Sequence, residues 1–257
     1  MPIKKKDYQQ QETENIIAEL EKELYLLQPS LRGWGEDYFR DSRERYFSQL
    51  SLIKQHYAGG EILEVGAIPC HMTFCLSRMG LPVTSLDLEP NRAAEFIQKH
   101  QLKILKCDIE RDRIPFGDEH FMMILCTEVF EHLRIDPIST LREINRVLHR
   151  QGKLIFSTPN LYTLDRMIKY LRGGGMDEPL SEYKKLSEVG HMGHFRVYTT
   201  RQVKQFLSHC GFTIQEIQYE MYHKMRKQPR FYFRDVCMRL VPKLRRFQIF
   251  IAGKCSV

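Results

Sequence analysis

Short apolar runs alternate with amphipathic stretches along the middle of the chain. The apolar runs have the length of β-strands and are Ile62–Val65, Val83–Leu86, Ile104–Cys107, Met122–Cys126 and Leu154–Ser157. The stretches with helical spacing are Phe74–Met79, Asn91–His100 and Ile138–Leu148. This alternation predicts βαβ units, hence a parallel sheet in an α/β fold with helices on both faces. Ligands of such sheets bind beyond the carboxyl ends of the strands.

The flanking segments complete this prediction. Helices are expected at residues 7–28, 34–57 and 200–210, and further strands at 212–219 and 247–252, whereas 161–198 looks irregular. We therefore expect a helical cap at residues 1–58. The main domain would occupy 59–257, with insertions at about 161–198 and 220–246.

Composition narrows the class of protein. The 257 residues are 42% hydrophobic, enough to bury a core, and no apolar run approaches the ~20 residues of a membrane-spanning helix. The N-terminus is basic but lacks the apolar stretch of a secretory signal, so we expect a cytoplasmic protein. The seven cysteines form no CxxC pair, which argues against a zinc site or a disulfide framework.

The net charge of +7 is concentrated near the C-terminus. Residues 221–246 contain nine Lys or Arg against one Asp, so the rest of the chain is close to neutral. Apolar residues recur there at helical spacing: Phe233, Val236, Leu240, Leu244 and Phe247. This amphipathic pattern predicts either a helix that covers the substrate cleft or peripheral contact with an anionic membrane.

Polar residues follow three successive strands where a nucleoside cofactor would bind. Gly66 directly follows the first strand, where a glycine lets the backbone approach a ligand closely. Asp87 ends the second strand, where its carboxylate can accept hydrogen bonds from ribose hydroxyls, and Asp108 follows the third, near an adenine amine. Each acid alone is also typical of a turn or a helix cap.

The motifs in sequence order resemble those of class I S-adenosylmethionine-dependent methyltransferases, in particular the ubiquinone-type O-methyltransferase group. They are ILEVGAIPCHMTFCLSRMG, VTSLDLEP, KCDIE, FMMILCTEVFEHL, LREINRVLHRQGKLIFSTPN and HFRVYTTRQVKQFLSHCGF, which together cover about residues 59–219. The resemblance implies a Rossmann-like, doubly wound sheet, mostly parallel with an antiparallel last strand. It also implies S-adenosyl-L-methionine as the cofactor.

The resemblance also implies roles for individual residues. Gly66 would contact the methionine part of the cofactor and Asp87 the ribose. Asp108 would contact the adenine, with Ile109 packed on its ring, and Glu64 would orient the glycine turn. The family usually has further glycines in this turn, where the present chain has Ile68 and Cys70.

A dinucleotide dehydrogenase is the nearest rival on the same fold. It would need the GxGxxG turn, whose second and third glycines are missing after Gly66. The missing glycines therefore disfavour a dehydrogenase.

The segment after the fourth strand lies beside the expected methyl donor. Glu128, Glu131 and His132 would share one face if a helix began there, and such a face can bind a metal or supply a base. The alternative is that Glu128 caps the helix, Glu131 is solvated and His132 packs under the cofactor without taking part in the chemistry. We select His132 and His194 as candidate catalytic bases and Glu128 as a cofactor contact. We predict no metal requirement, because a sulfonium is already an activated donor.

The sequence thus predicts a methyltransferase, O-directed, acting on a small-molecule, sugar or lipid-linked acceptor. An RNA or protein methyltransferase that docks through its basic insertion is an alternative, although nucleic acid is less favoured as a partner. A non-catalytic cofactor-binding protein is another, because Ile68 and Cys70 add bulk to the turn.

Overall fold

The computed structural model describes residues 5–175, 180, 184, 193–221 and 229–255. Its strands are β1 (Ile62–Val65), β2 (Val83–Asp87), β3 (Ile104–Lys106), β4 (Phe121–Thr127), β5 (Leu148–Pro159), β6 (Phe212–Glu220) and β7 (Phe247–Lys254). Its α-helices are α1 (Lys5–Glu23), α2 (Pro29–His56), α3 (His71–Arg78), α4 (Ala94–His100), α5 (Pro137–Val147), α6 (Leu164–Leu171), α8 (Thr200–His209) and α9 (Pro229–Leu240). Short 3-10 turns are η1 (Leu24–Leu26), η2 (Pro90–Ala93), η3 (Phe130–His132) and η4 (Pro242–Leu244).

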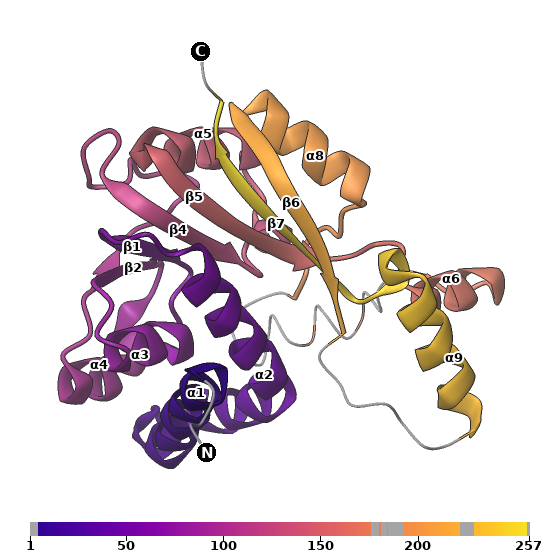
Figure 1. The fold of residues 1–257 in the computed structure, drawn as a ribbon, viewed down its shortest axis with the longest axis horizontal. Coiled ribbons are helices and arrows are strands. Elements are labelled where there is room, and N and C mark those ends of the chain that lie inside the picture. Colours follow the sequence, from indigo (N-terminus) through magenta and orange to yellow (C-terminus); the bar gives the residue numbers. More distant parts are fainter. Residues whose placement is uncertain (1–4, 176–179, 181–183, 185–192, 222–228, 256–257) are drawn as a thin grey trace.

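The strands form one sheet in the order β3-β2-β1-β4-β5-β7-β6 (Figure 1). The strands from β3 to β5 are parallel, and β7 is antiparallel to both β5 and β6. The predicted doubly wound, mostly parallel sheet with an antiparallel last strand is therefore confirmed. The strand order reverses between β1 and β4, so the loops that follow these two strands diverge and leave space for a ligand.

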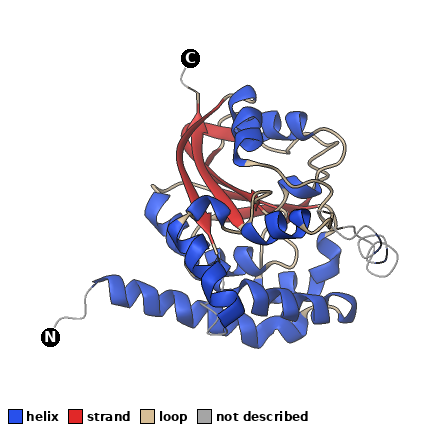
Figure 2. Ribbon diagram, turned by 90° about the vertical axis from the view of Figure 1, so that its right-hand side faces the viewer, coloured by secondary structure: helices blue, strands red, loops and turns tan. Residues whose placement is uncertain are grey.

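Side chains of the central strands alternate between two cores. Ile62, Met123 and Leu125 pack on the face covered by α1 to α4, whereas Leu63 and Ile124 face the core beneath α5 and α8. This alternation follows from the period of two in a strand. Figure 2 shows helices on both faces of the curved sheet.

Local capping explains where two of the helices begin. Asp136 accepts hydrogen bonds from the backbone N–H groups of Ile138 and Ser139 at the start of α5. Thr199 and Gln202 form a reciprocal capping box at the start of α8. Such caps pair backbone donors that a helix terminus cannot satisfy internally.

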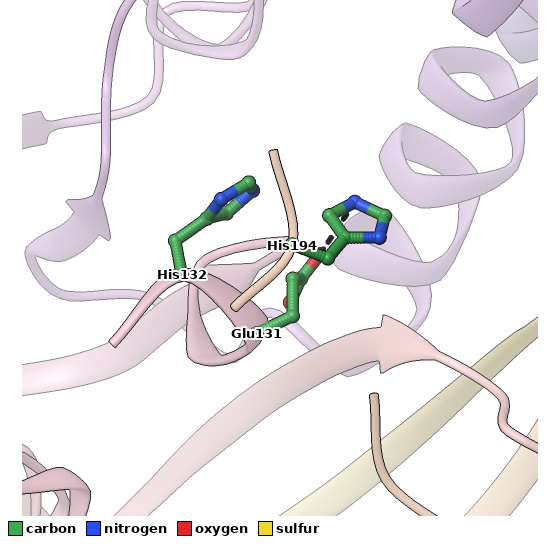
Figure 3. A group of neighbouring side chains, drawn as sticks. All are labelled: Glu131, His132 and His194. Atoms are coloured by element: carbon green, nitrogen blue, oxygen red, sulfur yellow. Dashed lines mark ion pairs between the residues drawn. The ribbon is translucent and has the colours of Figure 1, made fainter. Parts of the chain in front are cut away.

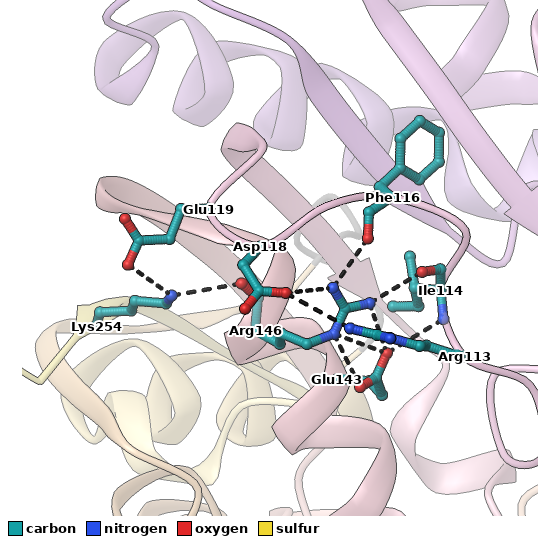
Figure 4. Close-up of polar contacts among 8 residues, drawn as sticks. All are labelled: Arg113, Ile114, Phe116, Asp118, Glu119, Glu143, Arg146 and Lys254. Atoms are coloured by element: carbon teal, nitrogen blue, oxygen red, sulfur yellow. Dashed lines mark hydrogen bonds and ion pairs between the residues drawn. The ribbon is translucent and has the colours of Figure 1, made fainter.

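A polar network on α5 holds the loop that precedes β4. The Arg146 guanidinium donates to the carbonyls of Ile114 and Phe116 and to the carboxylates of Asp118 and Glu143 (Figure 4). Since this loop enters the amino end of β4, the network lies at the edge opposite the expected ligand site and has a structural role.

Two predictions for the C-terminal half were wrong. Strand β5 begins six residues earlier than expected. Leu148 already pairs with Phe121, and the register shifts before Lys153 pairs with Met123, so polar residues lie in the first half of the strand. The stretch predicted to be irregular contains α6, whose N-cap Thr163 accepts the N–H of Arg166. The boundary at residues 58 and 59 and the limits of the two insertions stay predictions. No helix within the described residues is long and apolar enough to cross a bilayer.

Candidate functional site

The turn after β1 depends on Gly66. Its φ of +79° belongs to the left-handed region, and a Cβ there would lie 2.6 Å from Cγ2 of Val129. Both features favour glycine. The contact also shows that the turn after β1 directly abuts the segment after β4, so the predicted donor turn and the predicted reacting segment are neighbours.

Glu64 joins the strand to the helix that follows this turn. Its buried carboxylate accepts hydrogen bonds from the hydroxyls of Thr73 on α3 and Ser85 on β2. Burial raises the pKa of Glu64 to about 7, although these two hydrogen bonds act in the opposite direction. The position is suited to orienting the turn, and that role stays a prediction.

Asp87, at the end of β2, stabilises the same turn through hydrogen bonds. Its Oδ2 accepts the N–H of Ile68 at 2.9 Å and its Oδ1 accepts the N–H of Glu89 at 2.9 Å. A carboxylate offers about four acceptor positions, so roughly two remain for other donors. The predicted ribose contact is compatible with this geometry and stays a prediction.

Asp108 and Ile109 follow β3, the neighbour of β2. Asp108 Oδ1 accepts the N–H of Glu110 at 3.1 Å, which is the turn role that its position also suggested. Ile109 is partly buried against the core beneath α5. Since Asp87 pairs with Lys106 across the two strands, Asp108 lies close to the end of β2, and the adenine contact stays a prediction.

The two bulky residues of the turn belong to the hydrophobic core. Cys70 is fully buried and Ile68 is partly buried, both against the core covered by α1 to α4. Their side chains therefore contribute to the packing that fixes the turn.

Helix α2 contributes a residue that the sequence analysis missed. Arg45 is buried, with its guanidinium 4.9 Å from the ring centroid of Tyr38 and its Nη1 3.7 Å from Oε2 of Glu128. Its Nε has no hydrogen-bond partner among the described residues. A signal existed in the sequence, because Ser42, Arg45 and Gln49 place polar groups at helical spacing within an apolar stripe.

The segment after β4 does not begin the helix that the sequence analysis assumed. Glu128 has a φ of +57°, and only the short η3 turn follows it. Its N–H donates to the carbonyl of Ser157 and its Oε1 accepts the Ser157 hydroxyl at 2.8 Å. Burial raises the pKa of Glu128, while Arg45 opposes this shift. Glu128 therefore contacts Arg45 and β5, and the proposed helix face shared with Glu131 is wrong.

Glu131 is completely buried, which contradicts the alternative of a solvated side chain. Its Oε2 accepts the hydroxyl of Thr158 at 3.0 Å, whereas Oε1 has no hydrogen-bond partner among the described residues and lies 3.9 Å from Nε2 of His194. Burial and then the nearby charge of Glu128 raise the pKa of Glu131 well above its ordinary value.

The structure brings the two candidate catalytic histidines together with Glu131 (Figure 3). The ring centroids of His132 and His194 are 5.2 Å apart. The backbone N–H groups of Phe195 and Arg196 donate to the Glu131 carbonyl, and these bonds hold the loop that carries His194 against η3. One ligand atom from each of Glu131, His132 and His194 lies within 4.8 Å of the others. Such a group can accept a proton or hold a divalent metal. A further histidine near this group in the sequence, His191, lies outside the described residues.

Comparison with known proteins places methyltransferases among the similar sequences. Residues 63–156 match the family model for a methyltransferase domain. A tRNA U34 carboxymethyltransferase of Campylobacter curvus is 26% identical over 193 residues, or 68% of this chain and 60% of that protein. A ubiquinone biosynthesis O-methyltransferase of Xanthomonas oryzae pv. oryzae is 30% identical over 111 residues, or 40% of this chain and 44% of that protein. The chain thus spans less than two thirds of the length of these two relatives.

A solved structure shares the fold. The S-adenosylmethionine-dependent methyltransferase of Thermotoga maritima, described as a possible histamine N-methyltransferase, has a TM-score of 0.57 and 17% identity, with 86% of this chain and 95% of that chain covered. The resemblance found in the sequence motifs is confirmed for the fold and for residues 63–156: this segment matches the methyltransferase-domain family, and the chain has the fold of a class I S-adenosylmethionine-dependent methyltransferase.

Proposed function

We propose that the chain transfers the methyl group of S-adenosylmethionine to a hydroxyl oxygen of a small-molecule, sugar or lipid-linked acceptor. The observation that carries this proposal is the contact between Gly66 and Val129, which joins the donor turn to the segment bearing Glu131 and His132. A donor held by the turn would then lie next to groups that can take a proton.

The pair formed by Arg45 and Glu128 suits the charged methionine end of the donor. That end carries a carboxylate and an ammonium group, and the pair presents a guanidinium and a carboxylate 3.7 Å apart in a buried place. Arg45 Nε, which has no hydrogen-bond partner in the part of the chain that the structure describes, offers one further donor. We assign the donor carboxylate to Arg45 and the ammonium to Glu128, and we retain Gly66, Asp87, Asp108 and Ile109 as donor contacts.

Methyl transfer needs alignment and the removal of one proton. When bound, S-adenosylmethionine would supply a sulfonium-activated methyl group, and its transfer to the acceptor oxygen would break the carbon–sulfur bond. The hydroxyl proton then passes to an imidazole. Nδ1 of His132 lies 3.1 Å from the carbonyl of Gly193 and donates to it, so Nε2 carries the lone pair of the neutral ring.

His194 can take the same proton, because it lies beside the Glu131 carboxyl. A positive charge on the ring would be stabilised by that carboxyl in its ionised form. The O-directed chemistry is supported by the similarity to a ubiquinone biosynthesis O-methyltransferase.

A second candidate is an acceptor within tRNA. It is favoured by the longer match, over 193 residues, to a protein named for action on U34 of tRNA, and by the basic stretch at residues 221–246. The two candidates share the donor site and differ only in the acceptor.

Mass spectrometry of the purified, denatured protein tests the donor first. S-adenosylmethionine or S-adenosylhomocysteine should be released, and transfer of labelled methyl should follow when hydroxyl-bearing small molecules, lipid-linked acceptors and tRNA are supplied in turn. His194→Ala should lose transfer, whereas His209→Ala, an exposed histidine on α8, should retain it. If calorimetry detects no binding of S-adenosylhomocysteine to the folded chain, the chain is a non-catalytic member of the fold.

A further inference from the structure

Helix α6 carries an apolar face that the protein leaves exposed. None of its eight residues is buried, and the exposed side chains include Met167, Tyr170 and Leu171, of which Leu171 is 88% exposed. Positions i, i+3 and i+4 lie on one side of a helix, so these three side chains form a continuous apolar strip. A soluble domain rarely exposes such a strip without a partner for it.

Helix α9 adds a second apolar group beside it. Leu240 and Val241 are exposed at the end of α9, and Arg234 of α9 donates to Asp165 of α6 at 2.9 Å. Figure 1 shows the two helices next to each other, projecting beyond the sheet. We call this the α6–α9 surface; its apolar members are Tyr162, Met167, Tyr170, Leu171, Leu240 and Val241.

The charges on this surface are positive. Arg172, Arg239 and Lys243 are exposed at the ends of the two helices. The acids of the same segments are engaged, because Asp165 is paired with Arg234 and Asp235 is buried. Apolar side chains flanked by basic residues are complementary to an anionic lipid surface, into which the apolar groups insert while the cations contact headgroups. An RNA surface would not require exposed aliphatic side chains such as Leu171 and Leu240.

The sequence pattern offered membrane contact for the whole basic stretch at residues 221–246, which includes Arg245. The structure removes Arg245 from the membrane-contacting residues. Its guanidinium donates to the carbonyls of Met238 and Tyr219 and so joins α9 to β6. Lys224, Arg226 and Lys227 lie outside the described residues. Leu240, whose apolar pattern predicted either cover for the substrate cleft or membrane contact, is exposed.

The surface is close in the chain to the candidate catalytic group. Thr158 donates to Glu131 and lies a few residues before α6. Asn160, in the same short segment, donates from Nδ2 to the carbonyls of Lys243 and Arg245, which follow α9. We propose that the α6–α9 surface docks on an anionic membrane and so presents the strand-end site to an acceptor with a lipid tail. The docking is independent of methyl transfer, and only the choice of acceptor rests on the proposed function.

Vesicle flotation of the full chain tests the docking. The chain should float with phosphatidylcholine vesicles that contain phosphatidylglycerol and not with phosphatidylcholine alone, and salt should weaken binding. Arg239→Glu with Lys243→Glu should lower the partition coefficient roughly 30-fold. Leu171→Ser should lower it roughly tenfold, because the apolar insertion is lost.

Matched controls come from exposed residues on other surfaces. Ile135→Ser, and Arg201→Glu with Lys204→Glu on α8, should bind vesicles as the unaltered chain does. Circular dichroism should show that every variant is folded. Equal, negligible flotation with both vesicle types at low salt would overturn the proposal. A second set of results would also overturn it. The chain would bind tRNA, and the variant with Arg239→Glu and Lys243→Glu would lose that binding. Leu171→Ser would keep binding to both tRNA and vesicles, which would show that the apolar side chain has no role.

Discussion

Replacing Asp87 separates its structural role from its proposed ribose contact. Its carboxylate already accepts the N–H groups of Ile68 and Glu89, and about two acceptor positions remain for the ribose hydroxyls. Each hydrogen bond to a charged group contributes about 1.5–3 kcal/mol, with incomplete additivity. Asp87→Ala should therefore weaken donor binding by about 2–4 kcal/mol, which is roughly 30- to 900-fold in Kd.

The same variant should also be less stable, since two backbone N–H groups lose their acceptor. We expect a loss of about 1–3 kcal/mol in the free energy of unfolding, small enough for the chain to remain folded. Asp136→Ala is a matched control, because Asp136 accepts the N–H groups of Ile138 and Ser139 away from the donor turn. It should lower stability by about 1 kcal/mol and leave donor affinity unchanged.

Isothermal titration calorimetry with S-adenosylhomocysteine, combined with urea unfolding, measures both quantities for both variants. Unchanged affinity in a folded Asp87→Ala variant would refute the ribose contact. An equal loss of affinity in the two variants would show that lower stability alone explains the effect.

Three further predictions concern the same edge of the sheet. Gly66→Ala should cost about 2–4 kcal/mol of stability and most donor affinity, measured by unfolding and calorimetry, because it combines a positive φ with steric overlap. Because the pKa of Glu64 is raised, its contribution to stability is complete below about pH 4.5 and is lost as pH rises through about 7. Glu64→Gln should therefore flatten this part of the profile of unfolding free energy against pH. An unchanged profile would contradict the assignment. Activity should survive dialysis against a chelator; loss of activity that zinc or magnesium restores would instead make Glu131, His132 and His194 metal ligands.

The strands and most helices could be predicted from the sequence because their signals are local. Ile62–Val65 and the helix at Thr200–His209 follow from apolar periodicity and capping residues within a few positions. Helix α6 escaped prediction because its apolar face packs on no core, so its short pattern resembled an irregular insertion. Strand β5 was shortened because its first half is polar and partly exposed.

The candidate site was harder to predict because its contacts join distant parts of the chain. Arg45 meets Glu128 across 83 positions, and His194 meets Glu131 across 63. The left-handed backbone at Glu128 also has no local signal, since a glutamate at that place ordinarily continues or caps a helix. The strand-end rule located Asp87 and Asp108, but it could not show that Asp87 also braces the glycine turn.

Buried carboxyl groups gather near the carboxyl edge of the sheet. Glu64, Glu128 and Glu131 are all enclosed, and Arg45 is the buried guanidinium among them. Burial raises the pKa of each carboxyl, which favours its neutral form in the free chain. This arrangement lowers stability in isolation. S-adenosylmethionine carries a sulfonium and an ammonium, and both positive charges would favour the ionised carboxylates. The proposed donor would therefore account for this cluster of buried acids.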